Sequence, residues 1–222
     1  MELGRAIQSH VLLLFMDDRG QNLPKFRRVK SSVYPMTAEK RLVVLYGPPA
    51  SGKLPIAEAI SAQTGWILFD NAAAIDFVAQ FLPPGTSRFL ELIDSLRLDL
   101  IRAMLAEGRS VVFTFVYFGF DSEDISFLKF LAAAATSVGA SVHLVQLRCS
   151  EETLLKRVSI ANWDQSTKST TPQKLPQISK HSSFETLPGF GSLQIDTDSC
   201  GPDSAASMIV ECVRKEALAQ RC

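Results

Sequence analysis

The sequence predicts an α/β fold in which a mostly parallel sheet is covered by helices on both faces. Two observations support this prediction. Segments with strand and helix patterns alternate along residues 41–218, as is typical of layered α/β domains. The strand segments are also continuous apolar runs, which are expected where both faces of a parallel sheet are buried.

Five short apolar segments are expected to form the strands. The first, LVVLY, leads into a glycine-rich turn, and the second, WILF, is followed directly by Asp70. The third, VVFTF, carries a single hydroxyl group, at Thr114. The expected strands span residues 42–46, 66–69, 111–115, 142–147 and 193–195.

Amphipathic segments that follow these strands predict the helices. The clearest one spans residues 87–107, where apolar residues recur at helical spacing, and Gly108 is suited to end it. Another is expected to begin behind Ser150, because Glu151 and Glu152 favour the positive end of a helix. The expected helices span residues 53–63, 75–82, 87–107, 123–137, 151–158 and 202–218.

Two segments lie outside this alternation. Residues 1–40 are expected to form an N-terminal appendage, and residues 41–222 a single domain. Residues 25–30 (KFRRVK) could contact phosphate, although a solvated linker is the simpler interpretation. Residues 159–191 are rich in Ser, Thr, Pro, Gln and Lys. Because a loop this long is uncommon unless it is a lid, a binding loop or disordered, we expect a lid-like insertion here.

Composition excludes some classes of partner. Hydrophobic residues make up 46% of the chain and charged residues 21%, which is ordinary for a globular protein. The 23 Lys and Arg residues balance 23 Asp and Glu residues, so no charge excess favours nucleic acid or a membrane. The apolar run 11–16 is too short to span a bilayer, which needs about 20 residues. Asp17 and Asp18 follow it without a cleavage site, so a signal peptide is not expected.

The cysteines show no metal-binding or disulfide spacing. They are scattered, without a CxxC pair, which favours reduced thiols and a cytoplasmic location. The four are Cys149, Cys200, Cys212 and Cys222.

The stretch GPPASGK, which joins the first strand to the first helix, is typical of a phosphate-binding loop. Gly47 and Gly52 allow the backbone to turn its N–H groups inward, and the positive end of the helix adds to the attraction. Lys53 can reach the outer phosphates of a nucleotide. The alternative is a glycine-rich turn with a surface lysine. The expected nucleotide-binding residues are Gly47, Pro48, Pro49, Ala50, Ser51, Gly52, Lys53 and Leu54.

Leu54 departs from the usual pattern. Such loops carry a Ser or Thr at this position, whose hydroxyl binds Mg²⁺ directly, and leucine offers no oxygen. Pro55 is tolerable in the first helical turn. Three interpretations remain open. Magnesium is held by the nucleotide, water and another carboxylate; or binding survives with weak turnover; or the protein is a degenerate, regulatory nucleotide binder.

Three segments together resemble the small P-loop kinases, and more narrowly the shikimate-kinase-like and chloramphenicol-phosphotransferase-like enzymes. They are LVVLYGPPASGK, VQLRCSEETLLKRV and LQIDTDSCGPDSAASMIVE, and the resemblance covers about residues 41–218. It implies a three-layer P-loop NTPase fold with a five-stranded parallel sheet. It also implies ATP as the phosphoryl donor, Mg²⁺ as the metal and a small molecule as the acceptor.

The resemblance also implies roles for acidic residues. Phosphoryl transfer needs a carboxylate that orients or deprotonates the acceptor hydroxyl. Similar kinases have an acidic residue at the end of the second strand, so Asp70 is a candidate for this role and for binding Mg²⁺. A helix N-cap explains Asp70 equally well, and Asp76 is a secondary candidate. Thr114 could supply an oxygen linked to Mg²⁺, or its hydroxyl could simply bond within the sheet.

Lid arginines clamp the transferring phosphoryl group in similar kinases. Arg157, on the helix that enters the expected lid, is the candidate here, and residues 158–190 contain no arginine. A lysine balances charge but cannot make the two-pronged contact. Arg88 and Arg97 could bind an anionic substrate or could be exposed. The candidate catalytic residues are therefore Lys53, Asp70 and Arg157.

Two functions of different classes follow from these features. The first is a kinase that transfers the γ-phosphoryl group of ATP to the hydroxyl of a small molecule, with no nucleic acid or membrane partner. The second is a nucleotide-binding protein with little or no turnover, used as a sensor or interaction module, which Leu54 and the arginine-free lid favour. A purely structural α/β domain would require the phosphate loop to be accidental.

Overall fold

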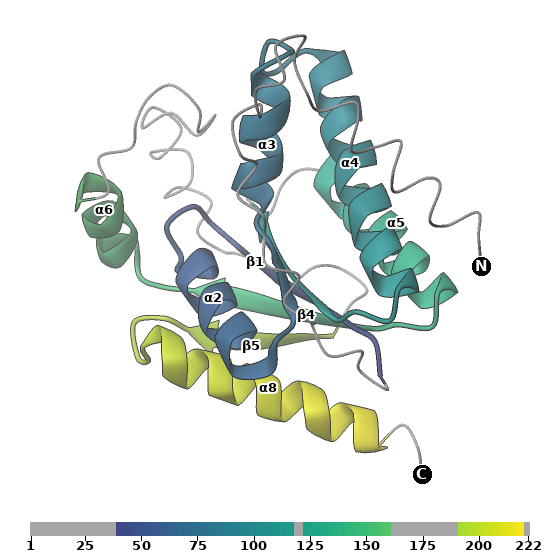
Figure 1. Cartoon of the computed structure of the whole chain (residues 1–222). Helices are drawn as coiled ribbons and strands as arrows, with labels where there is room; N and C mark the ends of the chain where they lie inside the picture. Colours follow the sequence, from purple (N-terminus) through teal and green to yellow (C-terminus); the bar gives the residue numbers. More distant parts are fainter. Residues whose placement is uncertain (1–38, 118–121, 161–190, 220–222) are drawn as a thin grey trace, which may run out of the picture. The chain divides into compact units, whose positions relative to one another are not determined.

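The structure, a computed structural model, describes residues 39–117, 122–160 and 191–219 (Figure 1). Within these residues, five strands form one parallel sheet in the order β2-β3-β1-β4-β5. The strands are β1 (Arg41–Gly47), β2 (Ile67–Phe69), β3 (Val111–Val116), β4 (Ser141–Arg148) and β5 (Ser192–Asp196). The helices are α2 (Lys53–Thr64), α3 (Asn71–Ala79), α4 (Ser87–Ala106), α5 (Ser122–Ser137), α6 (Glu151–Ile160) and α8 (Pro202–Ala219).

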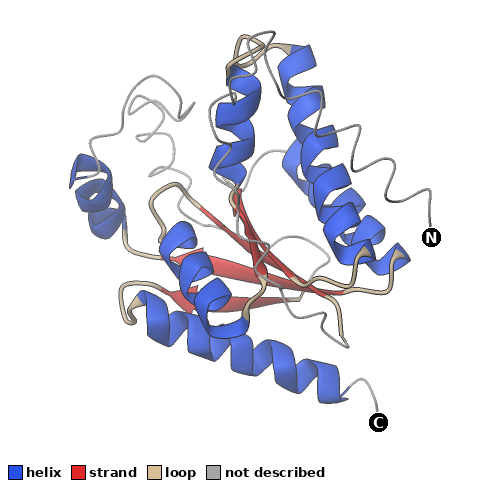
Figure 2. Cartoon of the chain, in the orientation of Figure 1, coloured by secondary structure: helices blue, strands red, loops and turns tan. Residues whose placement is uncertain are grey.

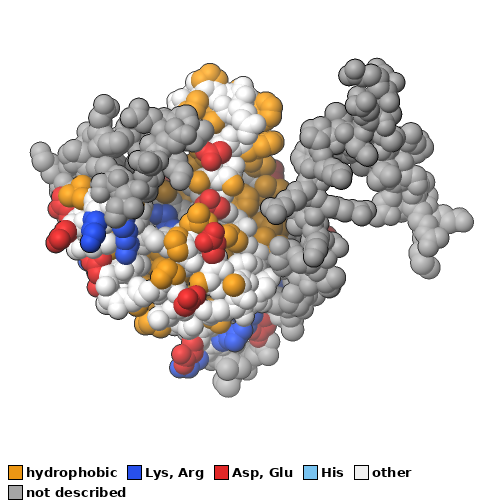
Figure 3. Space-filling view, turned by 60° about the vertical axis from the view of Figure 1, so that its left-hand side comes forward, with side chains coloured by type: hydrophobic (Ala, Val, Ile, Leu, Met, Phe, Trp, Pro, Cys, Tyr) orange, Lys and Arg blue, Asp and Glu red, His pale blue; other side chains and the backbone are white. Residues whose placement is uncertain are grey.

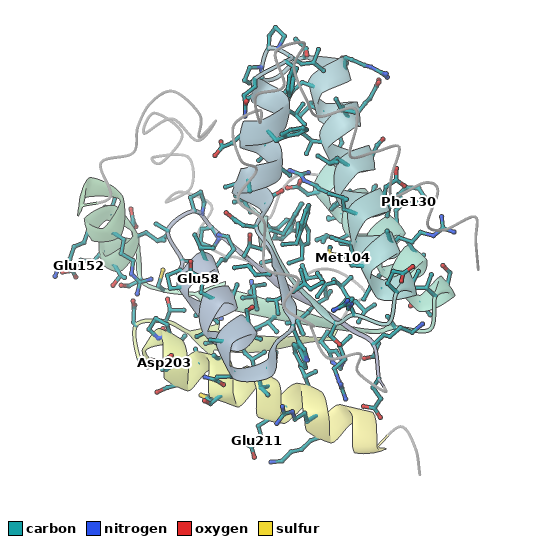
Figure 4. All side chains as sticks on the ribbon, viewed as in Figure 1. Glu58, Met104, Phe130, Glu152, Asp203 and Glu211 are labelled. Atoms are coloured by element: carbon teal, nitrogen blue, oxygen red, sulfur yellow. The ribbon has the colours of Figure 1, made fainter. Side chains whose placement is uncertain are left out.

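Helices cover the sheet on both faces, which confirms the predicted three-layer α/β fold. The pair α2 and α8 lies on one face, and α4 and α5 lie on the other (Figure 2). Figure 4 labels Glu58 and Asp203 on the first pair of helices, and Met104 and Phe130 on the second. Met104 packs against the core on its face, whereas Phe130 is exposed.

Strand β1 is the centre of the sheet. Residues 42–46 are at most 1% exposed, because alternate side chains enter two different cores. Val43 and Leu45 pack beneath α2 and α8, and Val44 and Tyr46 pack beneath α4 and α5. This double burial is the physical reason that the strand is a continuous apolar run. Because β1 pairs in parallel with β3 on one side and with β4 on the other, its carboxyl end lies between the ends of these two strands.

The helices α3 and α4 form an excursion between β2 and β3. They share a small core around Val78, Phe89 and Ile93. Phe77 and Phe81 remain exposed beside it, with their ring centroids 5.4 Å apart. Figure 3 shows apolar side chains gathered over this part of the molecule.

The structure corrects the predicted bounds of one helix. Helix α3 spans Asn71–Ala79 rather than residues 75–82. It begins earlier because the side chain of Asp70 accepts a hydrogen bond from the N–H of Ala72 and caps the first turn. The other predicted helices and strands agree with the structure to within two residues at each end.

Two predicted regions remain untested. All but the last residues of the expected appendage 1–40 lie outside the described residues, and so does the expected lid, apart from its margins at 159–160 and 191. Among the described helices, none is both long and apolar enough to cross a membrane.

Candidate functional site

The expected phosphate-binding loop begins at the carboxyl end of β1, beside β4. Gly47, the last residue of β1, has φ of 150°, a backbone conformation that side-chain-bearing residues rarely adopt. A Cβ at this position would lie 2.5 Å from the carbonyl oxygen of Leu147 in β4. Only glycine therefore fits at the entrance to the loop.

The loop ends at the positive end of α2. Gly52 caps the helix in the left-handed conformation, with φ of 91°. Among the described residues, the backbone N–H groups of Gly52, Lys53 and Leu54 have no acceptor. Unpaired donors at a helix N-terminus favour an anion, so this end of the loop fits a phosphate group.

Lys53 is folded back into the loop. Its side chain is 8% exposed. Its Nζ donates to the carbonyl oxygens of Gly47 at 3.0 Å and Pro48 at 2.5 Å, and to Ser51 Oγ at 3.4 Å. Burial lowers the pKa of Lys53 to about 7, although Cys149 and Asp70 oppose this shift. The alternative interpretation, a glycine-rich turn with a surface lysine, therefore does not hold for this buried side chain. The amine lies among the loop residues that we expect to hold phosphates.

Asp70 lies at the carboxyl end of β2 and is bonded to the neighbouring strand. Thr114 Oγ1 in β3 donates to Asp70 Oδ1 at 2.7 Å, and the same Thr114 oxygen accepts from the N–H of Asn71 at 3.0 Å. Asp70 also has the capping role that the sequence allowed, because its side chain accepts a hydrogen bond from the N–H of Ala72. The charge of Asp70 also acts on Lys53, which brings this carboxylate into the electrostatic environment of the loop.

The hydroxyl of Thr114 bonds to the carboxylate that follows the adjacent strand. It therefore does not bond within the sheet ladder, which was one of the two expectations for it, and the other, an oxygen linked to Mg²⁺, stays a prediction. Asp76, the secondary candidate, has a buried Oδ1 without a hydrogen-bond partner among the described residues. No described contact joins Asp76 to Asp70 or to the loop.

Arg157 joins three segments of the chain. From α6, its Nη1 donates to the carbonyl oxygen of Ala50 in the loop at 3.3 Å. The same nitrogen donates to Thr197 Oγ1 at 3.0 Å, and Nη2 donates to the Thr197 carbonyl oxygen at 2.9 Å. In this structure the guanidinium therefore ties the phosphate loop to the segment after β5.

Sequence reasoning missed two neighbours of this guanidinium. Cys149 follows β4, and its thiol lies within the electrostatic influence of Arg157 and Thr197. Burial raises the pKa of the Cys149 thiol, although Arg157 and Thr197 oppose the shift. The only signal for Thr197 was its place at the end of the last strand, in the third of the segments that resemble kinases.

The two arginines of α4 lie in different environments. Arg88 is exposed and paired with Glu91. The Arg97 side chain is 11% exposed, pairs with Asp94 at 2.7 Å and lies against the rings of Phe115 and Phe127. The expectation that Arg97 is exposed is therefore wrong, because its guanidinium lies over two aromatic rings.

The described residues offer little protein ligation for a metal ion. They contain no group of three or more His, Cys, Asp or Glu side chains that could hold one. Leu54 is 40% exposed and contributes no oxygen. The sequence-derived candidate for a protein ligand of Mg²⁺ is Asp70, and a carboxylate oxygen is a ligand that this ion accepts beside phosphate oxygens and water.

Comparison with known proteins finds solved kinases of the same fold. A sugar kinase from a Janibacter species, solved without ligand, is 20% identical with a TM-score of 0.57, and the match covers 78% of this chain and 93% of that one. A putative kinase from Chloroflexus aurantiacus is 16% identical, with a TM-score of 0.60 and coverage of 78% and 97%. Shikimate kinase from Acinetobacter baumannii, solved with shikimate, is 14% identical, with a TM-score of 0.53 and coverage of 80% and 94%.

No protein-family profile matches the chain, and no curated protein sequence does. At identities below 25%, the structural matches establish the fold alone. Together with the five-stranded parallel sheet, they show that the chain has the P-loop kinase-like fold that the sequence predicts.

Proposed function

We propose that the protein binds ATP in the loop 47–54 and transfers its γ-phosphoryl group to a hydroxyl group of a small molecule. The observation that carries this proposal is the position of Lys53, a buried amine held by the carbonyl oxygens of its own loop. Its burial is costly, and phosphate oxygens at the same place would compensate its charge better than two carbonyl groups do.

The loop supplies the binding. The free N–H groups at the start of α2 donate to phosphate oxygens, and Lys53 binds the outer phosphates. Arg157 fixes the far side of the loop through Ala50 and connects it to the segment after β5. When bound, Mg²⁺ would neutralise charge on the phosphates and would be held by the nucleotide and water, which leaves Asp70 free to act on the acceptor.

Asp70 supplies the base. The acceptor hydroxyl gives its proton to the Asp70 carboxylate as its oxygen forms a bond to the γ-phosphorus. The bond between that phosphorus and the bridging oxygen breaks, and ADP leaves with the electron pair. The proton then passes from Asp70 to solvent.

The test is acceptor-dependent ADP release, measured across a panel of small hydroxylated acceptors that includes sugars, sugar acids and cyclic polyols. For the wild type we expect release with at least one of them. Asp70→Asn keeps the helix cap but not the base, so it should reduce turnover by about 100-fold or more while ATP affinity stays within about threefold. Retained turnover in Asp70→Asn would refute the role of this carboxylate.

The second candidate function is nucleotide binding with little or no turnover, used as a sensor or interaction module. The oxygen-free side chain of Leu54 favours it, as does the lack of arginine in the sequence of residues 158–190. If the wild type binds ATP but releases no ADP with any acceptor, and Leu54→Ser gains ATP hydrolysis, this second function replaces the first. If the wild type does not bind ATP, both functions are refuted.

A further inference from the structure

We propose that Thr114 is a positioning residue that holds the Asp70 carboxylate in the orientation needed to accept the proton of the acceptor hydroxyl. This inference rests on the proposed kinase function and adds to it a residue from a different strand. It is carried by one buried hydroxyl group and the two hydrogen bonds that it makes.

The direction of the hydroxyl proton is determined by its neighbours. Thr114 is 3% exposed. Its Oγ1 accepts the N–H of Asn71 at 3.0 Å, and that N–H has no other role in the first turn of α3. The single proton of Thr114 is therefore directed to Asp70 Oδ1, at 2.7 Å.

One carboxylate oxygen is thereby occupied and the other is left available. Asp70 Oδ1 accepts from Thr114 and, at 3.4 Å, from the N–H of Ala72. Among the described residues, no donor reaches Asp70 Oδ2. A carboxylate held through one oxygen presents the other in a fixed direction, which is how a base is kept in place for proton transfer.

The sheet register determines which residue can do this. Phe69 of β2 pairs with Phe113 of β3, so the next residues, Asp70 and Thr114, are also neighbours across the two strands. Thr114 pairs on its other side with Leu45, whose side chain lies in the core beneath α2. The threonine hydroxyl therefore lies on the face of the sheet that α2 covers, and α2 carries Lys53 at its start.

The side chain of Thr114 is suited to positioning. A β-branched residue in a strand has restricted rotation about χ1, so its hydroxyl keeps one direction with little entropic cost. Valine has nearly the same shape and a similar preference for strands, but lacks the hydroxyl. Serine retains the hydroxyl with greater rotational freedom.

The experiment compares Thr114→Val and Thr114→Ser with the wild type, each alone and combined with Asp70→Asn. Acceptor-dependent ADP release gives kcat and KM, calorimetry gives the Kd of ATP, and thermal melting checks that each variant is folded. For Thr114→Val we expect kcat to fall by about 10- to 100-fold, with the Kd of ATP within about twofold. For Thr114→Ser we expect kcat within about threefold of the wild type.

The combined variants separate a positioning role from a structural one. If Thr114 acts through Asp70, then Thr114→Val should have no further effect on kcat once Asp70 is asparagine. The proposal is overturned if Thr114→Val retains wild-type kcat, if Thr114→Ser is as impaired as Thr114→Val, or if the effects of Thr114→Val and Asp70→Asn multiply. A wild type that binds ATP without releasing ADP would instead refute the kinase function, and this proposal with it.

Discussion

The two halves of the candidate site are built in different ways. The phosphate loop is one continuous stretch, 47–54, whose shape comes from glycine backbone conformations and from Lys53 bonding to its own loop. The Asp70 half joins the ends of two strands through the side-chain hydroxyl of Thr114. We infer that binding depends on backbone geometry and chemistry on a few side-chain contacts, so the two should respond differently to substitution.

The largest effect is expected for Gly47→Ala. The added Cβ would meet the Leu147 carbonyl oxygen at 2.5 Å, and the backbone at φ of 150° would be strained. The free energy of unfolding should fall by about 3 kcal/mol, with loss of ATP binding. Chemical denaturation and calorimetry measure the two quantities.

Gly191→Ala is the matched control, because a Cβ there meets nothing within 4 Å and its φ is not in the region that favours glycine. Its unfolding free energy should change by less than about 0.5 kcal/mol. Equal stability of the two variants would contradict a loop shaped by its backbone.

The next effect concerns pH and Lys53. Its pKa is about 7 in the ligand-free protein, and nearby phosphates would favour the charged form. Binding should therefore take up a proton above pH 7, so ATP affinity is highest at or below pH 7 and falls by up to about tenfold per pH unit above it. Calorimetry in two buffers with different ionisation enthalpies measures this uptake, which Lys53→Met should abolish.

The stability of the ligand-free protein should change in the opposite direction. Between pH 7 and about 10, the unfolded lysine retains a proton that the folded Lys53 has lost, so the free energy of unfolding should rise with pH. Denaturation of the wild type at pH 7 and pH 9 tests this, with Lys53→Met as the comparison. A pH dependence that is the same in both proteins would show that another group is responsible.

A smaller effect is expected for Leu54→Ser. The new hydroxyl would supply the oxygen that the loop lacks, so Mg²⁺ should strengthen ATP binding by about tenfold more than in the wild type. Titrations with Mg²⁺ and with EDTA measure the difference. Leu100→Ser, at a leucine of similar exposure on α4 (42% against 40%), should show no such gain. An equal response to Mg²⁺ in the wild type and Leu54→Ser would mean that the loop does not need this oxygen.

The smallest effect is expected for Arg157→Lys. Lysine can keep the charge, but it cannot bridge Ala50 and Thr197 with the planar fork that arginine uses here. ATP affinity should fall by about threefold, and unfolding free energy by about 1 kcal/mol. A loss of turnover far larger than the loss of affinity would instead place Arg157 on the transferring phosphoryl group.

The same division explains how far the sequence could predict the molecule. Strand β1, its loop and α2 were predictable because apolar periodicity, glycine spacing and Lys53 are local signals. The start of α3 was missed because the helix was expected to begin only at residue 75, whereas Asp70 caps it directly after the second strand. Capping was considered only as an alternative role for that residue.

The contacts between distant segments could not be predicted. The bond from Thr114 to Asp70 depends on the strand order, which places β3 between β1 and β2. The bonds from Arg157 to Ala50 and Thr197 depend on where α6 packs. Neither the strand order nor the helix packing leaves a pattern in one sequence. The structure supplies these contacts, and the functional roles of the side chains are proposals that rest on them.

The most direct measurement is a calorimetric titration of ATP into the wild type and Lys53→Met, at pH 7 with Mg²⁺. Methionine keeps the length of the side chain but not its charge. If the loop 47–54 holds the nucleotide phosphates, the wild type should bind one ATP per chain, and Lys53→Met should bind it at least about tenfold more weakly. No binding by the wild type, or equal affinity in the two proteins, would contradict nucleotide binding in this loop.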